Sequence, residues 1–164
     1  TDWFLVVPFL PLAIVLAAVL ERSLRNIVLV IAITSWPGTA RLVRAQVLTV
    51  KQRLYVDRAR ALGASRRHVI RRHILPNVLA PALVLATLNI GATILAAAAL
   101  SFLGLGAQPP MPEWGAMLAD TRDLMSSHPW VMAFPGIAIL ITVLAINLMG
   151  DGLRDALDPK LKRS

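Results

Sequence analysis

The chain has 164 residues, of which 57% are hydrophobic and 16% are charged, against a norm of roughly 25% charged in soluble domains. It contains no cysteine, which excludes disulfide scaffolds, thiolate metal sites and thiol catalysis. The charges are clustered and unbalanced, with 17 basic and 9 acidic residues giving a net charge of +8, so the composition indicates an integral membrane protein rather than a water-soluble domain.

Two apolar segments in the first third of the sequence predict membrane-spanning helices, at residues 3–20 and 26–43. A bilayer core requires about 20 helical residues and offers no water to backbone groups, so such segments must be helical. We expect Pro37 and the neighbouring residues to bend the second span. Because the chain begins with Thr1 rather than Met, we also expect it to be part of a longer protein.

The next segment carries most of the positive charge. Residues 41–72 hold ten of the 17 basic residues and one acid, Asp57. Lys and Arg concentrate in the cytoplasmic loops of membrane proteins. We therefore predict that residues 47–76 form a cytoplasmic loop.

A helix, a glycine turn and a second short helix are predicted within this loop. Tyr55, Ala59 and Leu62 recur with the spacing of one helix face. Gly63 suits the left-handed position that follows a helix end, and Ser65 suits the N-cap of the helix after it.

Proline and histidine residues complete the predicted loop. Pro76 lacks an amide proton, and we expect it to mark the boundary before the next span. His68 and His73 are five residues apart, about 140° around an α-helix, which makes them a poor chelating pair. We therefore predict no metal site.

The residues alone leave three roles open for this loop: a solvated basic loop that fixes topology, a nucleic-acid-binding unit, or a docking element for a soluble protein. Two short, membrane-tethered helices without a dimer element argue against DNA binding. The small residues Ala61, Gly63, Ala64 and Ser65 permit close approach by a partner, which favours docking.

Two further spans are predicted at residues 79–102 and 130–149. Asn89 and Asn147 lie inside them, where polar side chains face protein or a water-filled path. Both are candidates for lining a solute path, with an interhelical hydrogen bond as the alternative.

The charge pattern then fixes a complete topology. Residues 104–129, with a net charge of −2, form an outside loop, and the tail 150–164 is cytoplasmic. The expected fold is an all-α integral membrane protein with four spans, a cytoplasmic helix-turn-helix and both chain ends in the cytoplasm.

The basic loop resembles the signature of bacterial ABC-importer permeases: Glu-Ala-Ala, three residues, Gly, nine residues, then Ile-x-Leu-Pro. Asp57-Arg58-Ala59, Gly63 and His73-Ile74-Leu75-Pro76 stand at these positions, with departures at Asp57 and Arg58. Four further blocks resemble the "C"-type permease subunit of the dipeptide/oligopeptide/nickel branch, at residues 36–44, 100–106, 112–115 and 147–159. The resemblance covers nearly the whole chain, whereas members of the family normally have six spans and close to twice this length.

This resemblance implies a permease subunit that forms half of a translocation path for di- or oligopeptides. It implies coupling to an ATPase through Asp57, Ala59, Ala61, Leu62, Gly63, Ala64 and Ser65, with loop geometry set by His73, Leu75 and Pro76. Separately, the third span is unusually rich in small side chains, which suits close packing against a partner permease; these are Gly91, Ala92, Ala96 to Ala99 and Ser101. Nickel or glutathione transport, or a non-transporting membrane anchor for a cytosolic protein, are the alternatives.

The implied setting is the bacterial cytoplasmic (inner) membrane, with its lipids. The implied partners are two ABC ATPase subunits, a second homologous permease chain and an extracytoplasmic solute-binding protein, and no nucleic acid. The chain has no glycine-rich phosphate loop followed by Lys-Ser/Thr. We therefore expect no catalytic residue and no cofactor in this chain, with ATP and Mg bound by the partner ATPases.

Overall fold

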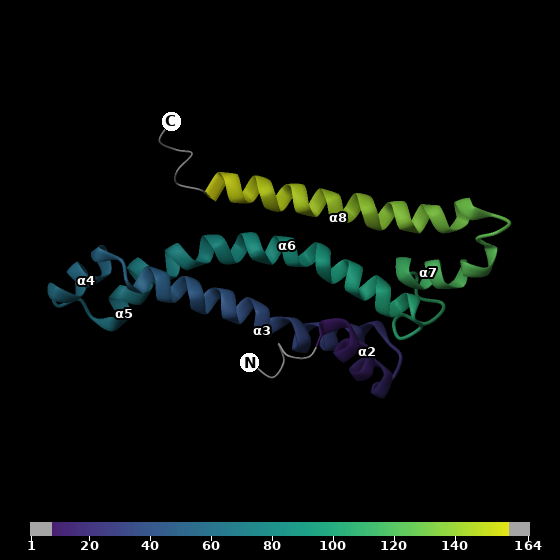
Figure 1. Cartoon of the computed structure of the whole chain (residues 1–164), viewed down its shortest axis with the longest axis horizontal. Coiled ribbons are helices and arrows are strands. Elements are labelled where there is room, and N and C mark those ends of the chain that lie inside the picture. The colour runs from purple at the N-terminus through teal and green to yellow at the C-terminus, as the bar shows by residue number, and fades with distance from the viewer. Residues whose placement is uncertain (1–7, 158–164) are drawn as a thin grey trace.

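The computed structural model describes residues 8–157 and contains helices and turns but no strand in this range. Three long helices lie side by side along the molecule: α3 (Leu24–Lys51), α6 (Leu75–Phe102) and α8 (Pro129–Leu157) (Figure 1). The central one is α6, which packs against both of the others. Each of the three is long and apolar enough to cross a membrane, so the predicted all-α, multi-span class is confirmed.

The first predicted span corresponds in part to α2 (Phe9–Val19), a helix of 11 residues. At 1.5 Å per residue it is about 16 Å long, roughly half of a bilayer core. Ala13 and Ala17 of α2 are buried against Ile27 and Val30 of α3. Residues 3–7 lie outside the described residues, so this span, and with it the total of four, stays a prediction.

The second predicted span, 26–43, lies within a longer helix. Ser23 caps α3 by accepting a hydrogen bond from the Asn26 amide at 3.2 Å, and Pro37 lies inside the helix without ending it. With 28 residues α3 is about 42 Å long, more than a bilayer core. Its last turns therefore project beyond the apolar part and carry the segment that follows.

The third predicted span begins earlier than expected, because the helix does not break at Pro76. The helix α5 (Arg66–Val69), the π-helical turn η1 (Ile70–Ile74) and α6 form one continuous helix. In the π turn the Leu75 amide donates to the Ile70 carbonyl, and the Asn77 side chain donates to the His73 carbonyl at 2.8 Å. These bonds accommodate a proline that cannot donate, so Pro76 marks a change of helix type rather than a boundary.

The small residues of α6 are used within the chain. A Cβ at Gly91 would lie 3.1 Å from Asn147 Oδ1 of α8, and a Cβ at Gly115 would overlap the Ala98 backbone. Gly115 belongs to α7 (Trp114–Asp120), which packs against α6 and α8 and is followed by the short helix η2 (Arg122–Leu124). Gly91 and Ala98 therefore pack within this chain, against α8 and α7, and packing of the other small residues of α6 against a partner permease stays a prediction.

Candidate functional site

A compact helical segment lies beyond the ends of α3 and α6. It comprises residues 52–74, with α4 (Leu54–Ala61), α5 and η1, and we call it the α4–α5 segment (Figure 1). Val56 and Val69 are 0% and 3% exposed, and Val50 at the end of α3 is 6% exposed. These buried valines show that the segment has an apolar interior, which favours a defined shape over a flexible loop.

The turn between the two short helices has a Schellman geometry. Gly63 has φ of +80°, its amide donates to the Arg60 carbonyl at 2.9 Å, and the Ala64 amide donates to the Ala59 carbonyl at 3.0 Å. This pair of bonds satisfies the last carbonyls of α4 and requires a residue that tolerates the left-handed region. The predicted role of Gly63 in the turn is confirmed.

The following helix begins as the sequence indicates. The Ser65 hydroxyl accepts a hydrogen bond from the His68 amide at 3.3 Å, which confirms the predicted N-cap. Together the cap and the Schellman turn fix the angle between α4 and α5. Whether this turn contacts an ATPase stays a prediction.

Most of the predicted coupling residues lie on the surface of this turn. Asp57, Ala61, Leu62, Gly63 and Ser65 are exposed, whereas Ala59 and Ala64 are half-buried. Leu62 is 89% exposed, the highest value among the large hydrophobic residues that the structure describes. An apolar side chain projects here from a polar surface.

Leu54 is a further exposed apolar residue that the sequence analysis missed, at 74% exposure. Leu62, the C-cap residue of α4, follows it by eight residues, a spacing that directs both side chains toward one side of the helix. The i, i+7, i+8 pattern formed by Leu54, Ala61 and Leu62 was the available signal. It was obscured by the overlapping pattern of Tyr55, Ala59 and Leu62.

The charged pair on α4 contributes little rigidity. Asp57 and Arg60 form an ion pair at 3.6 Å, and both side chains are about half exposed. Exposed pairs of this kind contribute at most about 1 kcal/mol. Asp57 is therefore available to a partner surface.

An aromatic cluster holds α4 against the π turn. The ring of His73 lies 5.8 Å from Tyr55 and 5.8 Å from His68, centroid to centroid. The predicted 140° separation of the two histidines is wrong because it assumed α-helical geometry, whereas a π turn brings residues five apart onto one face. The described residues contain no group of three or more potential metal ligands.

Three residues were predicted to set the geometry of the loop, and His73 is the one whose ring packs against other rings. Leu75 and Pro76, the other two, lie at the start of α6 and are exposed. They lie at the change from π to α geometry, and their role in the geometry of the loop stays a prediction.

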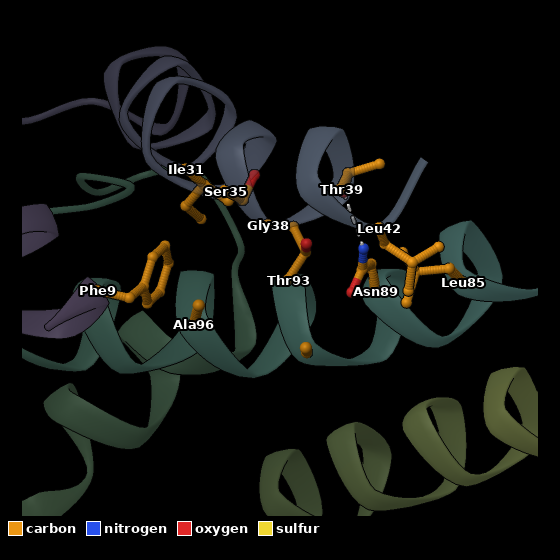
Figure 2. A pocket seen from close by; sticks show the side chains of 11 residues that line it. Phe9, Ile31, Ser35, Gly38, Thr39, Leu42, Leu85, Asn89, Thr93 and Ala96 are labelled. Carbon is orange, nitrogen blue, oxygen red and sulfur yellow. Dashed lines mark hydrogen bonds between the residues drawn. The ribbon is translucent and has the colours of Figure 1, made fainter. Parts of the chain in front are cut away.

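A largely apolar pocket of about 380 Å³, with four polar side chains in its lining, lies between α2, α3 and α6 (Figure 2). Asn89 of α6 points into it and donates a hydrogen bond to the Thr39 hydroxyl of α3 at 3.4 Å. The lining residues are Phe9, Ile31, Ser35, Gly38, Thr39, Leu42, Leu85, Asn89, Ala92, Thr93 and Ala96. The predicted candidate Asn89 therefore faces other polar groups rather than only apolar ones.

The sequence analysis missed three polar residues of this pocket: Ser35, Thr39 and Thr93. Ser35 and Thr39 are four residues apart on α3, and Asn89 and Thr93 are four apart on α6. Two i, i+4 polar pairs in otherwise apolar helices were the available signal.

Asn147 does not line this pocket. It lies on α8 against Gly91, and α8 runs along the side of α6 away from α3 (Figure 1). The structure therefore separates the two asparagines that the sequence analysis grouped together, and a path-lining role for Asn147 stays a prediction.

Comparison with known proteins assigns the chain to a family. Residues 1–163 match the family of binding-protein-dependent transport system inner membrane components. The chain belongs to this family. It is a multi-pass inner-membrane component of a transport system and not itself an enzyme, which confirms the resemblance drawn from the loop motif.

Two curated relatives are similar over most of the chain. The dipeptide transport system permease protein DppC of Alkalihalophilus pseudofirmus is 51% identical over 161 residues, covering 98% of this chain and 53% of the relative. The glutathione transport system permease protein GsiD of Escherichia coli is 52% identical over 155 residues, covering 94% of this chain and 51% of the relative. The chain spans about half the length of these relatives.

Proposed function

We propose that the protein is a permease subunit of a binding-protein-dependent ABC importer for di- or oligopeptides. The observation that carries this proposal is the α4–α5 segment, a packed element with the exposed residue Leu62 beside a rigid turn, placed beyond the ends of helices long enough to span a membrane. Such an element suits docking into a cleft of a soluble motor protein. Family membership supports the transport role.

Coupling would proceed by rigid-body motion. ATP-driven closure of two ATPase subunits moves the α4–α5 segment, which is continuous with α6 through η1. Because α6 packs against both α3 and α8, movement of its end tilts the helices that line the path. The chain itself binds neither ATP nor Mg in this scheme.

Orientation and partners follow from the same proposal. The α4–α5 segment lies in the cytoplasm, where the positive residues concentrate, and the α7 region lies outside. A second homologous permease completes the path, and an extracytoplasmic binding protein delivers the solute.

The pocket between α3 and α6 is the candidate path surface. The hydroxyl and amide groups there are uncharged and can form hydrogen bonds, which suits the polar, uncharged groups of a peptide backbone. The long Asn89–Thr39 contact of 3.4 Å leaves both groups able to exchange partners.

The printed names of the relatives favour peptide cargo: one is a dipeptide permease and the other a glutathione permease. Glutathione is itself a tripeptide, so both fall in one chemical class. Nickel is the remaining candidate within the branch. The test measures uptake of labelled dipeptide, glutathione and Ni²⁺ by vesicles that contain the full-length permease and its partners. The solute that accumulates identifies the cargo.

Gly63→Val tests the coupling role. A β-branched residue in the left-handed region costs about 1–3 kcal/mol, which the turn relieves by changing shape. We expect the variant to insert normally while ATP-driven uptake falls about tenfold or more, since each 1.4 kcal/mol of lost docking energy is a factor of ten. The measurements are ATPase activity and uptake by the reconstituted complex.

Gly104→Val is the matched control. Gly104 has φ of +78° and, like Gly63, would place a Cβ in open space, but it ends α6 at the opposite end of the molecule. The control suffers the same backbone strain and should keep ATP hydrolysis coupled to uptake. Equal transport in both variants and the parent protein would remove the basis for the proposal.

Copurification separates transport from simple anchoring. A permease complex brings an ATPase and a second permease chain through purification, whereas a membrane anchor brings a cytosolic protein without either.

A further inference from the structure

Three arginines at the base of the α4–α5 segment form a surface hollow. Arg67, Arg71 and Arg72 line it together with His68, and all four are exposed. The sequence has no acidic residue between Asp57 and Glu113. Within residues 8–157 none of the three arginines has an ion-pair partner, so their charges are not neutralised by the described part of the chain.

The π turn brings these arginines together. Residues five apart share a face there, as the neighbouring rings of His68 and His73 demonstrate. The same geometry aligns Arg67 with Arg72, while Arg67 and Arg71 are aligned by their four-residue spacing in the helix. A regular α-helix would turn Arg72 away from Arg67.

The edge of the hollow nearest the membrane, at Arg72, is expected just beyond the layer of lipid headgroups. Arg72 is six residues before Val78, where the long apolar stretch of α6 begins, which is about 9 Å along the helix. The headgroup layer extends about 5–7 Å beyond each side of the hydrocarbon core. Arginine side chains bridge the remaining distance by extending their apolar stems along the protein surface.

An exposed apolar ridge continues from the arginines into the membrane. Leu75, Leu79 and Leu83 follow Arg71 at four-residue intervals and are 46%, 47% and 50% exposed. Residues at this spacing form one ridge of a helix. The surface therefore presents cationic groups whose side chains can extend toward the headgroup layer, with an apolar strip on the membrane side of them.

We propose that this surface binds an anionic phospholipid, with the phosphate held by Arg67, Arg71 and Arg72 and an acyl chain lying along the leucine ridge. Guanidinium groups bind phosphate oxygens in pairs of parallel hydrogen bonds. Three basic residues near an anionic surface predict about a hundredfold preference for anionic over neutral lipid at low salt. The leucine ridge favours lipid over an acidic protein surface, because a soluble partner would leave it uncovered.

The test uses the full-length permease in its complex, delipidated in detergent and supplied with phosphatidylglycerol or phosphatidylcholine. Native mass spectrometry measures retained lipid, and thermal unfolding measures stabilisation. We expect the parent protein to retain and be stabilised by phosphatidylglycerol, and a triple variant, Arg67→Gln, Arg71→Gln, Arg72→Gln, to lose most of this preference. The matched control, Arg22→Gln, Arg25→Gln, Arg122→Gln, removes equal charge away from the hollow and should keep it.

Several results would overturn the proposal. The parent protein could show no headgroup preference, or the triple variant could keep it. Glycerol 3-phosphate could displace the lipid at equal concentration, which would make the hollow a site for a free phosphate. The triple variant could instead lose its ATPase subunits in neutral detergent while still retaining phosphatidylglycerol, which would make the hollow a protein contact. The lipid preference of the parent protein is measured first. Its absence overturns the proposal even if the triple variant does not fold.

Discussion

Gly63 and Gly115 are glycines for different physical reasons. Gly63 provides a backbone conformation, because its φ of +80° belongs to the left-handed region and its Cβ would meet no atom within 4 Å. Gly115 provides space, because a Cβ there would overlap the backbone of Ala98. Substitution at the first site changes the direction of a turn, whereas substitution at the second separates two helices.

Replacing Gly115 with Ala should therefore move α7 away from α6. Backbone atoms cannot yield as a flexible side chain does, so we expect a loss of about 1–3 kcal/mol in stability. Thermal unfolding of the detergent-solubilised protein measures the effect. Gly136→Ala in α8, where a Cβ meets nothing within 4 Å, should instead gain about 0.5–1 kcal/mol. An unchanged stability in Gly115→Ala would mean that α7 is not held in this position.

The pocket makes a separate prediction at Asn89. If this amide contacts the transported solute, Asn89→Leu should lower uptake at low substrate by about two- to tenfold, the value of one neutral hydrogen bond. Thr34→Val is the control, because its hydroxyl donates to the Val30 carbonyl of its own helix and lies outside the pocket. If Asn89 only joins the helices, uptake stays normal and stability falls by about 0.6 kcal/mol.

At the scale of residues, the sequence allowed interactions between neighbours in the chain to be predicted, but not contacts between side chains of different helices. The roles of Gly63 and Ser65 in the turn were predictable because a helix cap and a Schellman turn depend on residues within one or two turns of each other. The Asn89–Thr39 contact joins residues 50 apart in the sequence, so it depends on how two helices face one another.

At the scale of elements, the α4–α5 segment has a buried side and an exposed side. Val56 is fully buried, and Leu62, only six residues later, is 89% exposed. Val56→Ala removes about two methylene equivalents from the interior and should destabilise the segment by about 1.6 kcal/mol. Protease sensitivity of the segment measures this loss.

Leu62→Ala is the complementary change. An 89% exposed side chain contributes little to folding, so protease sensitivity should stay unchanged. Binding of the ATPase should weaken, because an apolar anchor is removed from the proposed interface. Normal ATPase affinity in Leu62→Ala would place the interface elsewhere on the segment.

Helix ends were the least predictable feature of these elements. Pro37 and Pro76 both lie in longer helices than the apolar runs alone indicate, since α3 extends to Lys51 and the helix before α6 begins at Arg66. Hydropathy detects where a helix can be surrounded by lipid, but it does not detect where the helix continues into water. The π turn before Pro76 depends on backbone hydrogen bonds that periodicity does not reveal.

At the scale of the whole molecule, the three long helices leave much apolar surface uncovered. Only 11% of the most apolar part of α8 is buried by the rest of the chain. In water such a surface would aggregate, so lipid or further membrane helices must cover it. This distribution agrees with the membrane class that composition indicated, while the arrangement with α6 at the centre required the structure.

The orientation of this arrangement is the last prediction. The α4–α5 segment and the α7 region lie at opposite ends of the helices, so one membrane orientation places them on opposite sides (Figure 1). Because this chain has no cysteine, Ala61→Cys and Ser126→Cys, both at exposed positions, give unique labelling sites in a full-length protein otherwise free of cysteine. An impermeant maleimide added to intact cells should label Ser126→Cys, and should label Ala61→Cys only after permeabilisation. Labelling of Ala61→Cys from outside would place the basic segment on the wrong side for an ATPase and would contradict the positive-inside reasoning as well.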